Sequence, residues 1–325
     1  MKRVVTLKEP SKLIIILAFA SLYLIWGSTY LGIMIAIKSI PPFFMVAARF
    51  LGAGIILFTW CLFQGEKLPS FKTFCTIGLG GILMLFLGNG AVTWSEQYVP
   101  TGLAAIVVAS VPLWFVLLDK KHWKYNFSNK FIIAGIIVGF AGVLMLFTGK
   151  GSIDLSGSKM KVISFFVLIV GTIGWAVGSL YSKYKVVEAS TSMKVAVQMI
   201  VAGIVGVLAA ILRNEQKDFV MSNVSWPSII ALLYLIIMGS LVAYMSYIWL
   251  LSVRPASLVG TYAYVNPVVA VFLGWLILDE AITTQQVVAL VVILAGVILV
   301  NFSSDKKKVA EEKKVAMAEA KASVT

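Results

Sequence analysis

Polar side chains that recur at four-residue spacing inside long apolar runs are the residues of this sequence best suited to bind a small molecule. Asn89 and Thr93 form one such pair, and Tyr262 and Asn266 form another, directly before Pro267. A spacing of four places two side chains on one face of a helix, and lipid offers them no hydrogen-bond partner. We therefore expect each pair to face a neighbouring helix or a solute. Because Pro267 lacks a backbone N–H, we expect a break in the helix there.

Aromatic residues occupy similar positions in the apolar runs, among them Trp26, Tyr30, Trp175 and Tyr244. Together they predict a ring-lined cavity that suits flat or aromatic solutes. For each of them taken alone, packing between helices or a place in the interfacial aromatic belt is the simpler explanation.

Arg49 is the only basic residue inside an apolar run. Charged residues at such positions usually face the interior of a helix bundle or a cavity, so Arg49 is a candidate to attract an anionic group of a substrate. Two structural roles stay open beside this one. The long side chain could reach the membrane interface, or it could pair with Glu96 at the end of the next run.

Enzymatic, metal and cofactor chemistry find little support in the sequence. The two cysteines, Cys61 and Cys75, lie in apolar stretches and His122 is the only histidine, which makes a disulfide framework or a metal site improbable. The phosphate-binding pattern Gly-x-x-x-x-Gly-Lys-Ser/Thr does not occur. We therefore expect no enzyme, no catalytic residue, no metal and no cofactor. All acidic residues lie in loops, tails or helix ends, so the sequence indicates no coupling ion, and uniport stays open.

The composition places these residues in a membrane protein. Of 325 residues, 60% are hydrophobic and 13% are charged, whereas soluble domains carry about 25% charged residues. A spanning helix needs about 20 mostly apolar residues. The sequence predicts an all-α integral membrane protein with ten transmembrane helices, over residues 13–37, 43–64, 73–94, 101–118, 131–148, 162–182, 195–212, 228–250, 256–278 and 285–302.

The distribution of lysine and arginine predicts the orientation of these helices. If the N-terminus is cytoplasmic, 20 of the 26 cations outside the runs lie on the cytoplasmic side, as the positive-inside rule requires. Both termini are then cytoplasmic. The net charge of +13 is thereby explained by topology, and no nucleic-acid partner is expected.

An internal repeat relates the two halves of the chain. An offset of 155 residues superposes Trp94 on Trp249, Pro100 on Pro255 and Pro112 on Pro267. The first five runs then correspond to the last five, and because five is odd the two repeats are inverted. We expect a first repeat over residues 12–149, a second over 160–302, and a charged tail over 303–325 that is a solvated helix or disordered. Inverted repeats are typical of secondary transporters.

Three sequence motifs carry a resemblance to a known family. They are Trp26-Gly27-Ser28-Thr29-Tyr30, Val99-Pro100-Thr101-Gly102-Leu103-Ala104-Ala105 and Tyr262-Ala263-Tyr264-Val265-Asn266-Pro267. Over about residues 12–302 the chain resembles the drug/metabolite transporter superfamily, and within it the EamA-type exporters. The resemblance implies a bacterial inner-membrane carrier of two five-helix halves that exports metabolites, amino acids or drugs. One departure is the segment 119–124, which lacks the Gly-Glu often found there, whereas the second half keeps Glu280.

The expected function is therefore a secondary transporter that exports a small molecule by alternating access. An importer of a sugar or amino acid on the same scaffold is an alternative, and a membrane sensor or assembly subunit that transports nothing is another. The expected partners are a small-molecule substrate and the lipid bilayer; monomer and homodimer both stay open. The candidate substrate-binding residues are Trp26, Tyr30, Arg49, Asn89, Thr93, Trp175, Tyr244, Tyr262 and Asn266.

Overall fold

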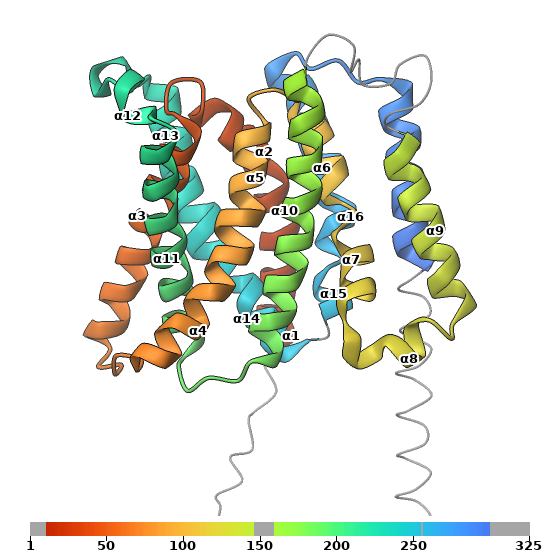
Figure 1. Cartoon of the computed structure of the whole chain (residues 1–325), viewed down its shortest axis with the longest axis horizontal. Helices are drawn as coiled ribbons and strands as arrows, with labels where there is room; N and C mark the ends of the chain where they lie inside the picture. Colours follow the sequence, from red (N-terminus) through yellow and green to blue (C-terminus); the bar gives the residue numbers. More distant parts are fainter. Residues whose placement is uncertain (1–10, 146–158, 255, 300–325) are drawn as a thin grey trace, which may run out of the picture.

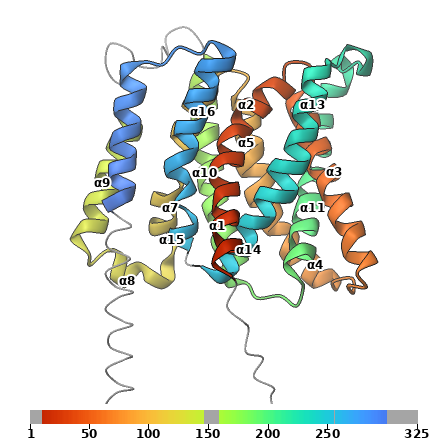
Figure 2. The same ribbon diagram turned by 180° about the vertical axis from the view of Figure 1, so that it is seen from behind.

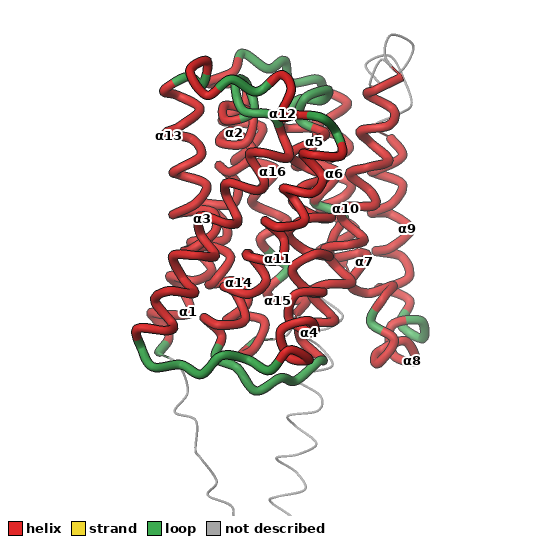
Figure 3. The backbone as a smooth tube through the Cα atoms, turned by 60° about the vertical axis from the view of Figure 1, so that its left-hand side comes forward, coloured by secondary structure: helices red, strands yellow, loops and turns green. Residues whose placement is uncertain are grey.

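The computed structural model describes residues 11–145, 159–254 and 256–299, and every regular element within these ranges is a helix (Figures 1 and 3). The all-α prediction is confirmed for this part of the chain. The cations before residue 11, the ends of the fifth and tenth predicted runs and the tail 303–325 lie outside the described residues.

Within the described residues, seven helical stretches are long and apolar enough to cross a membrane. Four of them lie in the first half of the chain. The first is Lys12–Ala36, which comprises α1 (Lys12–Ala20), η1 (Ser21–Ile25) and α2 (Trp26–Ala36), and the second is α3 (Pro42–Phe63). The third is Phe71–Ser95, with α4 (Phe71–Gly81), η2 (Ile82–Asn89) and α5 (Gly90–Ser95), and the fourth is Thr101–Leu118, with α6 (Thr101–Val108) and α7 (Val111–Leu118). The other three are α10 (Lys159–Tyr184), α11 (Thr191–Leu212) and Trp226–Val253 (α13 Trp226–Tyr234, η5 Leu235–Tyr244, α14 Met245–Val253).

The remaining predicted runs form shorter helices. The fifth run is α9 (Lys130–Met145), which meets the segment of η3 (Lys120–His122) and α8 (Trp123–Asn126) at a bend of 107°. The ninth run contains α15 (Ala256–Val259) and α16 (Tyr262–Leu278), and the tenth contains the helix Thr284–Leu299. The loop between α11 and α13 carries α12 (Glu215–Asp218) and η4 (Met221–Asn223). A count of ten spans therefore stays a prediction.

The helix ends follow from local sequence. The hydroxyls of Ser70, Ser190 and Ser225 each accept a hydrogen bond from the N–H three residues later, so each serine caps the start of a helix. Pro42 begins α3 at a position where a missing N–H is harmless. The predicted position of the break at Pro267 is wrong, because Pro267 lies inside α16 and the turn falls earlier, at residues 260–261.

Three of the helices contain π-helical segments, in which the chain carries an extra residue per turn. These segments are η1, η2 and η5. η2 and η5 lie in the third helix of the first half and the third helix of the second half, so the same irregularity occurs at matching places in the two halves.

The packing of α3 against α11 is built from two equivalent contacts. A Cβ on Gly54 would lie 2.9 Å from the backbone nitrogen of Ile200, and a Cβ on Gly203 would lie 2.8 Å from that of Leu51. The step along the sequence from Gly54 to Gly203 is the same as the step from Leu51 to Ile200. This step of 149 residues also separates Trp26 from Trp175 and is slightly shorter than the offset of 155 that relates later positions of the two repeats. The two helices therefore approach each other through a pair of glycine contacts at equivalent positions of the two repeats.

Two glutamates add a second repeated contact. Glu66, in the loop after α3, accepts a hydrogen bond of 2.6 Å from Ser190, the residue that caps α11. Glu215 follows Glu66 by the same step along the sequence and lies in the loop after α11. It accepts from the N–H groups of Phe43 and Phe44 at the start of α3. The acid that follows each helix thus holds the beginning of the other.

The helices stand side by side between two ends of the molecule, which Figures 1 and 2 show from opposite sides. One end carries the start of α1 together with α8, and we call it the α8 end. The other carries α12 and the start of α3, and we call it the α12 end. The lysine-rich segment 120–124 therefore lies at the same end as the beginning of the first helix.

Candidate substrate site

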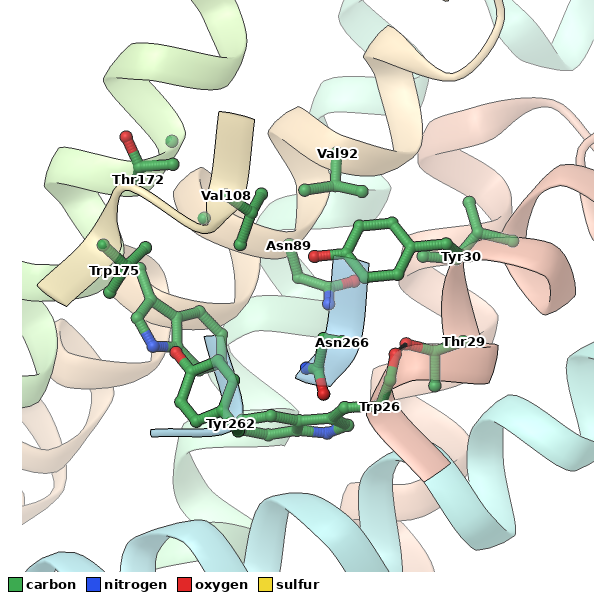
Figure 4. Close-up of a pocket in the computed structure, with 14 residues that line it drawn as sticks. Trp26, Thr29, Tyr30, Asn89, Val92, Val108, Thr172, Trp175, Tyr262 and Asn266 are labelled. Atoms are coloured by element: carbon green, nitrogen blue, oxygen red, sulfur yellow. Dashed lines mark hydrogen bonds between the residues drawn. The ribbon is translucent and has the colours of Figure 1, made fainter. Parts of the chain in front are cut away.

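A cavity of about 520 Å³ lies between helices of both halves (Figure 4). α2, η2, α5, α6 and α7 contribute to it from the first half, and α10 and α16 contribute from the second. Six of the candidate residues line it: Trp26, Tyr30, Asn89, Trp175, Tyr262 and Asn266.

Three aromatic rings on one side of the cavity, those of Trp26, Trp175 and Tyr262, pack closely with one another and with Tyr247, which does not line the cavity. The ring of Trp26 contacts those of Trp175, Tyr247 and Tyr262 at centroid distances of 5.4, 5.0 and 5.1 Å. The indole N–H of Trp26 donates to the carbonyl of Gly239 and that of Trp175 donates to the hydroxyl of Tyr247, each at 3.2 Å. Because the protein itself satisfies the indole N–H groups, these two indoles offer a solute mainly their apolar surfaces, which suit stacking.

Tyr30 and Asn89 offer the cavity free polar groups. Among the described residues, neither the hydroxyl of Tyr30 nor the amide nitrogen of Asn89 forms a hydrogen bond. Both side chains line the cavity, and Figure 4 shows the Tyr30 hydroxyl directed toward Asn89. A polar group of a solute placed between them would meet a hydroxyl and an amide donor.

Arg49 is not among the residues that line the cavity. Its side chain is 2% exposed; Nε donates to Ser240 and Nη1 donates to Oδ1 of Asn89, both at 3.0 Å. No carboxylate of the described residues lies within 4.0 Å of it, so the pairing with Glu96 is not formed in this structure. Arg49 therefore acts on the cavity through Asn89, whose amide orientation it fixes, and through its charge.

The remaining candidate residues, Asn266, Tyr244 and Thr93, are buried among neighbouring helices. With its amide nitrogen turned toward the first helix, Asn266 donates to the carbonyls of Leu22 and Tyr23 at 3.0 and 3.2 Å. Tyr244 lies outside the cavity and donates to Gln198 at 2.7 Å. Thr93 is fully buried outside the cavity, and its hydroxyl has no partner among the described residues.

The candidate list taken from the sequence leaves out several of the lining residues. Thr29 and Thr172 line the cavity beside Val108 and Val111. Thr172 and the ring neighbour Tyr247 belong to polar runs with the same three- to four-residue spacing as Asn89, and this spacing predicts that they can line a cavity. Val108 and Val111 are apolar residues in an apolar run, and nothing in the sequence separates them from packing residues.

The side chains that line this cavity are of types that can bind a small solute. In the described part of the chain no group of three or more His, Cys, Asp and Glu side chains is close enough to hold a metal ion. What the cavity provides is a wall of rings, two free polar groups and a nearby buried cation.

Comparison with known proteins agrees with this architecture. The chain matches the EamA-like transporter family over residues 13–148 and again over 162–302. It is 38% identical over 285 residues to a protein of Escherichia coli strain K12 named the uncharacterized inner membrane transporter YedA, covering 87% of this chain and 89% of that protein. A second protein of that strain, named a probable amino-acid metabolite efflux pump, is 23% identical over 84% of this chain and 89% of its own length.

A solved structure shares the fold. A crystal structure with 18% sequence identity superposes with a TM-score of 0.64 and covers 89% of this chain and 97% of its own. The family match over both halves and the similarity to the inner membrane transporter settle the family of this chain. It is a membrane protein that belongs to the EamA-like transporter family.

Proposed function

We propose that this protein is a secondary transporter that exports a small organic solute across the bacterial inner membrane by alternating access. The observation that carries the proposal is that the cavity is lined from both halves of the chain and contains the free polar groups of Tyr30 and Asn89. Binding between two repeats that rock against each other is how many secondary transporters work. The repeated contacts between α3 and α11 support two equivalent halves.

We further propose that the substrate combines a flat ring with an anionic group. The indole and phenol rings beside the cavity favour a planar solute, because stacked and edge-on ring pairs contribute about 0.5–1.5 kcal/mol beyond their buried area. The positive charge of Arg49, which is hydrogen-bonded to the lining residue Asn89, favours binding of an anion over a cation in the cavity. An aromatic carboxylate meets both requirements.

Location and direction of transport rest on the relatives and on the distribution of charge. The 38% identical relative is named an inner membrane transporter and the 23% identical one an efflux pump, which supports export from the cytoplasm. The lysines of segment 120–124 lie at the α8 end with the start of α1, which favours a cytoplasmic α8 end under the positive-inside rule.

Counterflow in proteoliposomes tests the proposal. Vesicles that contain the full-length protein and are preloaded with phenylpyruvate should transiently accumulate labelled phenylpyruvate, and vesicles without protein should not. Tyr30→Phe removes the free hydroxyl and should weaken binding by about 0.5–1.5 kcal/mol. The matched control is Trp60→Phe, because Trp60 is 58% exposed on the outer surface of α3 and should leave counterflow unchanged.

The substrate class is tested by comparing three probes. Phenylpyruvate carries a ring and a carboxylate, phenylalanine adds an ammonium group, and indole has no charge. We expect phenylpyruvate to compete best against its own labelled form. If none of the three is transported by the wild-type protein, the proposed substrate class is wrong; if indole competes best, the role of the Arg49 charge is wrong.

A further inference from the structure

A second cavity at the α12 end contains a carboxyl group with unusual surroundings. Glu96 directly follows the helix Phe71–Ser95 and lines a cavity of about 770 Å³ together with Lys38, Lys161 and Glu280. Its side chain is 1% exposed, and neither carboxylate oxygen has a hydrogen-bond partner among the described residues. A buried carboxylate without partners is strongly disfavoured, so this group holds its proton in the conformation described here.

Glu280, which lines the same cavity, differs from Glu96 because its carboxylate oxygens are hydrogen-bonded. Its two oxygens accept from the N–H and hydroxyl of Thr101 at 2.8 and 2.9 Å and from the N–H of Gly102 at 3.3 Å. Glu280 is thereby occupied in capping the start of α6. Two carboxyl groups whose surroundings differ this much divide their roles, one remaining a fixed anion and the other carrying a proton.

The charged and titratable groups around Glu96 belong to several helices. Arg49 on α3, Tyr30 on α2 and Glu280 interact with it electrostatically, and Lys38 and Lys161 line the same cavity. Burial raises the pKa of the Glu96 carboxyl well above its usual value, Glu280 raises it further, and Arg49 acts in the opposite direction. Arg49 itself has no carboxylate within 4.0 Å in the described part of the chain, so its charge is not neutralised by a direct ion pair.

We propose that Glu96 is a proton-binding site whose protonation is linked to the binding of a substrate anion near Arg49, so that proton and anion move together. The inference rests on the transport function proposed above and adds the coupled ion. A hydronium ion in the α12-end cavity gives one proton to a carboxylate oxygen of Glu96 and becomes water, and the Glu96 carboxyl returns that proton to a water molecule when the substrate has left.

The linkage between proton binding to Glu96 and anion binding follows from the net charge around Arg49. When Glu96 is ionised, its negative charge compensates that of Arg49, and a substrate anion would add an uncompensated charge in a medium of low dielectric constant. When Glu96 is neutral, Arg49 attracts the anion instead. By reciprocity, a bound anion must strengthen proton binding to Glu96 by the same factor as the proton strengthens anion binding.

Infrared spectroscopy tests the proton without any ligand. In lipid-reconstituted full-length protein with ¹³C-labelled glutamate carboxyl groups, we expect at neutral pH a C=O band of a protonated carboxyl that disappears as the pH rises. The band should be absent from Glu96→Gln and present in Glu66→Gln, the matched control, whose carboxyl is hydrogen-bonded at the other end of the molecule. Absence of the band from the wild type, or its persistence in Glu96→Gln, would overturn the proton site.

Calorimetry of phenylpyruvate binding tests the linkage. Above the midpoint of the infrared band, wild-type affinity should fall by about tenfold per pH unit if one proton is linked, whereas Glu96→Gln should bind with nearly constant affinity. A pH dependence that survives in Glu96→Gln overturns the linkage.

Two further outcomes separate this inference from the proposed function. If Glu96→Gln does not fold, wild-type titrations above the band midpoint in phosphate and in Tris buffers measure proton uptake directly. About one proton per phenylpyruvate supports the linkage, and none overturns it. If phenylpyruvate does not bind to the wild type, both the proposed substrate class and the linkage to this anion fail, and the infrared band alone decides whether Glu96 holds a proton.

Discussion

Arg49 carries a positive charge into the apolar interior and is held there by neutral partners only, Ser240 and Asn89. Replacing it by Gln removes the charge but leaves no opposite charge unpaired, and unpaired buried charges are the main reason such substitutions unfold proteins. We therefore expect Arg49→Gln to keep the melting temperature of the wild type within a few degrees while weakening phenylpyruvate binding. Two opposite charges about 8 Å apart attract by about 2 kcal/mol at an effective dielectric constant of about 20, so the loss of affinity should be about tenfold or more.

The measurement is calorimetry beside thermal unfolding in detergent, with Arg213→Gln as control. Arg213 is an exposed cation that follows α11 at the α12 end, so its replacement should change neither quantity. If Arg49→Gln binds normally but melts far below the wild type, Arg49 is a structural residue.

For single residues, the four-residue spacing of polar side chains predicted which of them are buried, but it did not predict which groups they contact. Asn89 was predictable because lipid cannot satisfy an amide. Asn266 satisfied the same rule and yet donates to carbonyls of the first helix, a contact that depends on where a helix from the opposite end of the sequence lies. Arg49 was predicted to face the cavity, but it does not line it; its guanidinium instead donates to Asn89 and to Ser240 of the eighth predicted run.

Glycines set the distance between neighbouring helices, and two of them in the third helix make a matched test. A Cβ on Gly81 would lie 2.3 Å from the backbone oxygen of Gln198, whereas a Cβ on Gly90 would have no neighbour closer than 3.9 Å. Gly81→Ala should lower the melting temperature, because forcing extra volume into a packed contact costs about 1–3 kcal/mol.

Gly90→Ala should be neutral or stabilising, because alanine favours a helix over glycine by about 0.8–1.0 kcal/mol. Both variants are compared by thermal unfolding of purified protein. Equal melting temperatures would show that α4 and α11 adjust freely to each other, contrary to the close backbone contact.

At the scale of elements, hydropathy predicted the long helices to within a few residues, since length and apolar character alone decide them. The breaks inside helices were not predicted correctly. The run 101–118 divides at residues 109–110, just before Pro112, while Pro267 is accommodated within α16. Both prolines lack an N–H, so the difference arises from packing against neighbours, which a single sequence does not reveal. The π segments likewise left no signal in the hydrophobic pattern.

For the whole molecule, the distribution of charge makes a topological prediction. Alkaline phosphatase fused after Thr325 should be inactive, because 20 of the 26 cations outside the spans lie on the cytoplasmic side when both termini are there. The same reporter inserted after Val220, in the loop that carries α12, should be active, because that loop lies at the opposite end from α8. An active fusion at Thr325 would contradict the proposed orientation and the even number of spans.

The π segments have a geometric consequence for the whole carrier. Removing the extra residue of a π turn restores α-helical hydrogen bonding and rotates everything beyond it by about 100°, the angle per residue in a helix of about 3.6 residues per turn. η2 and η5 are therefore places where a slip of hydrogen-bond register would turn one face of a helix away from the cavity without bending the helix axis. Arg49 donates to Asn89 in η2 and to Ser240 in η5, so a single side chain opposes such a rotation in both halves.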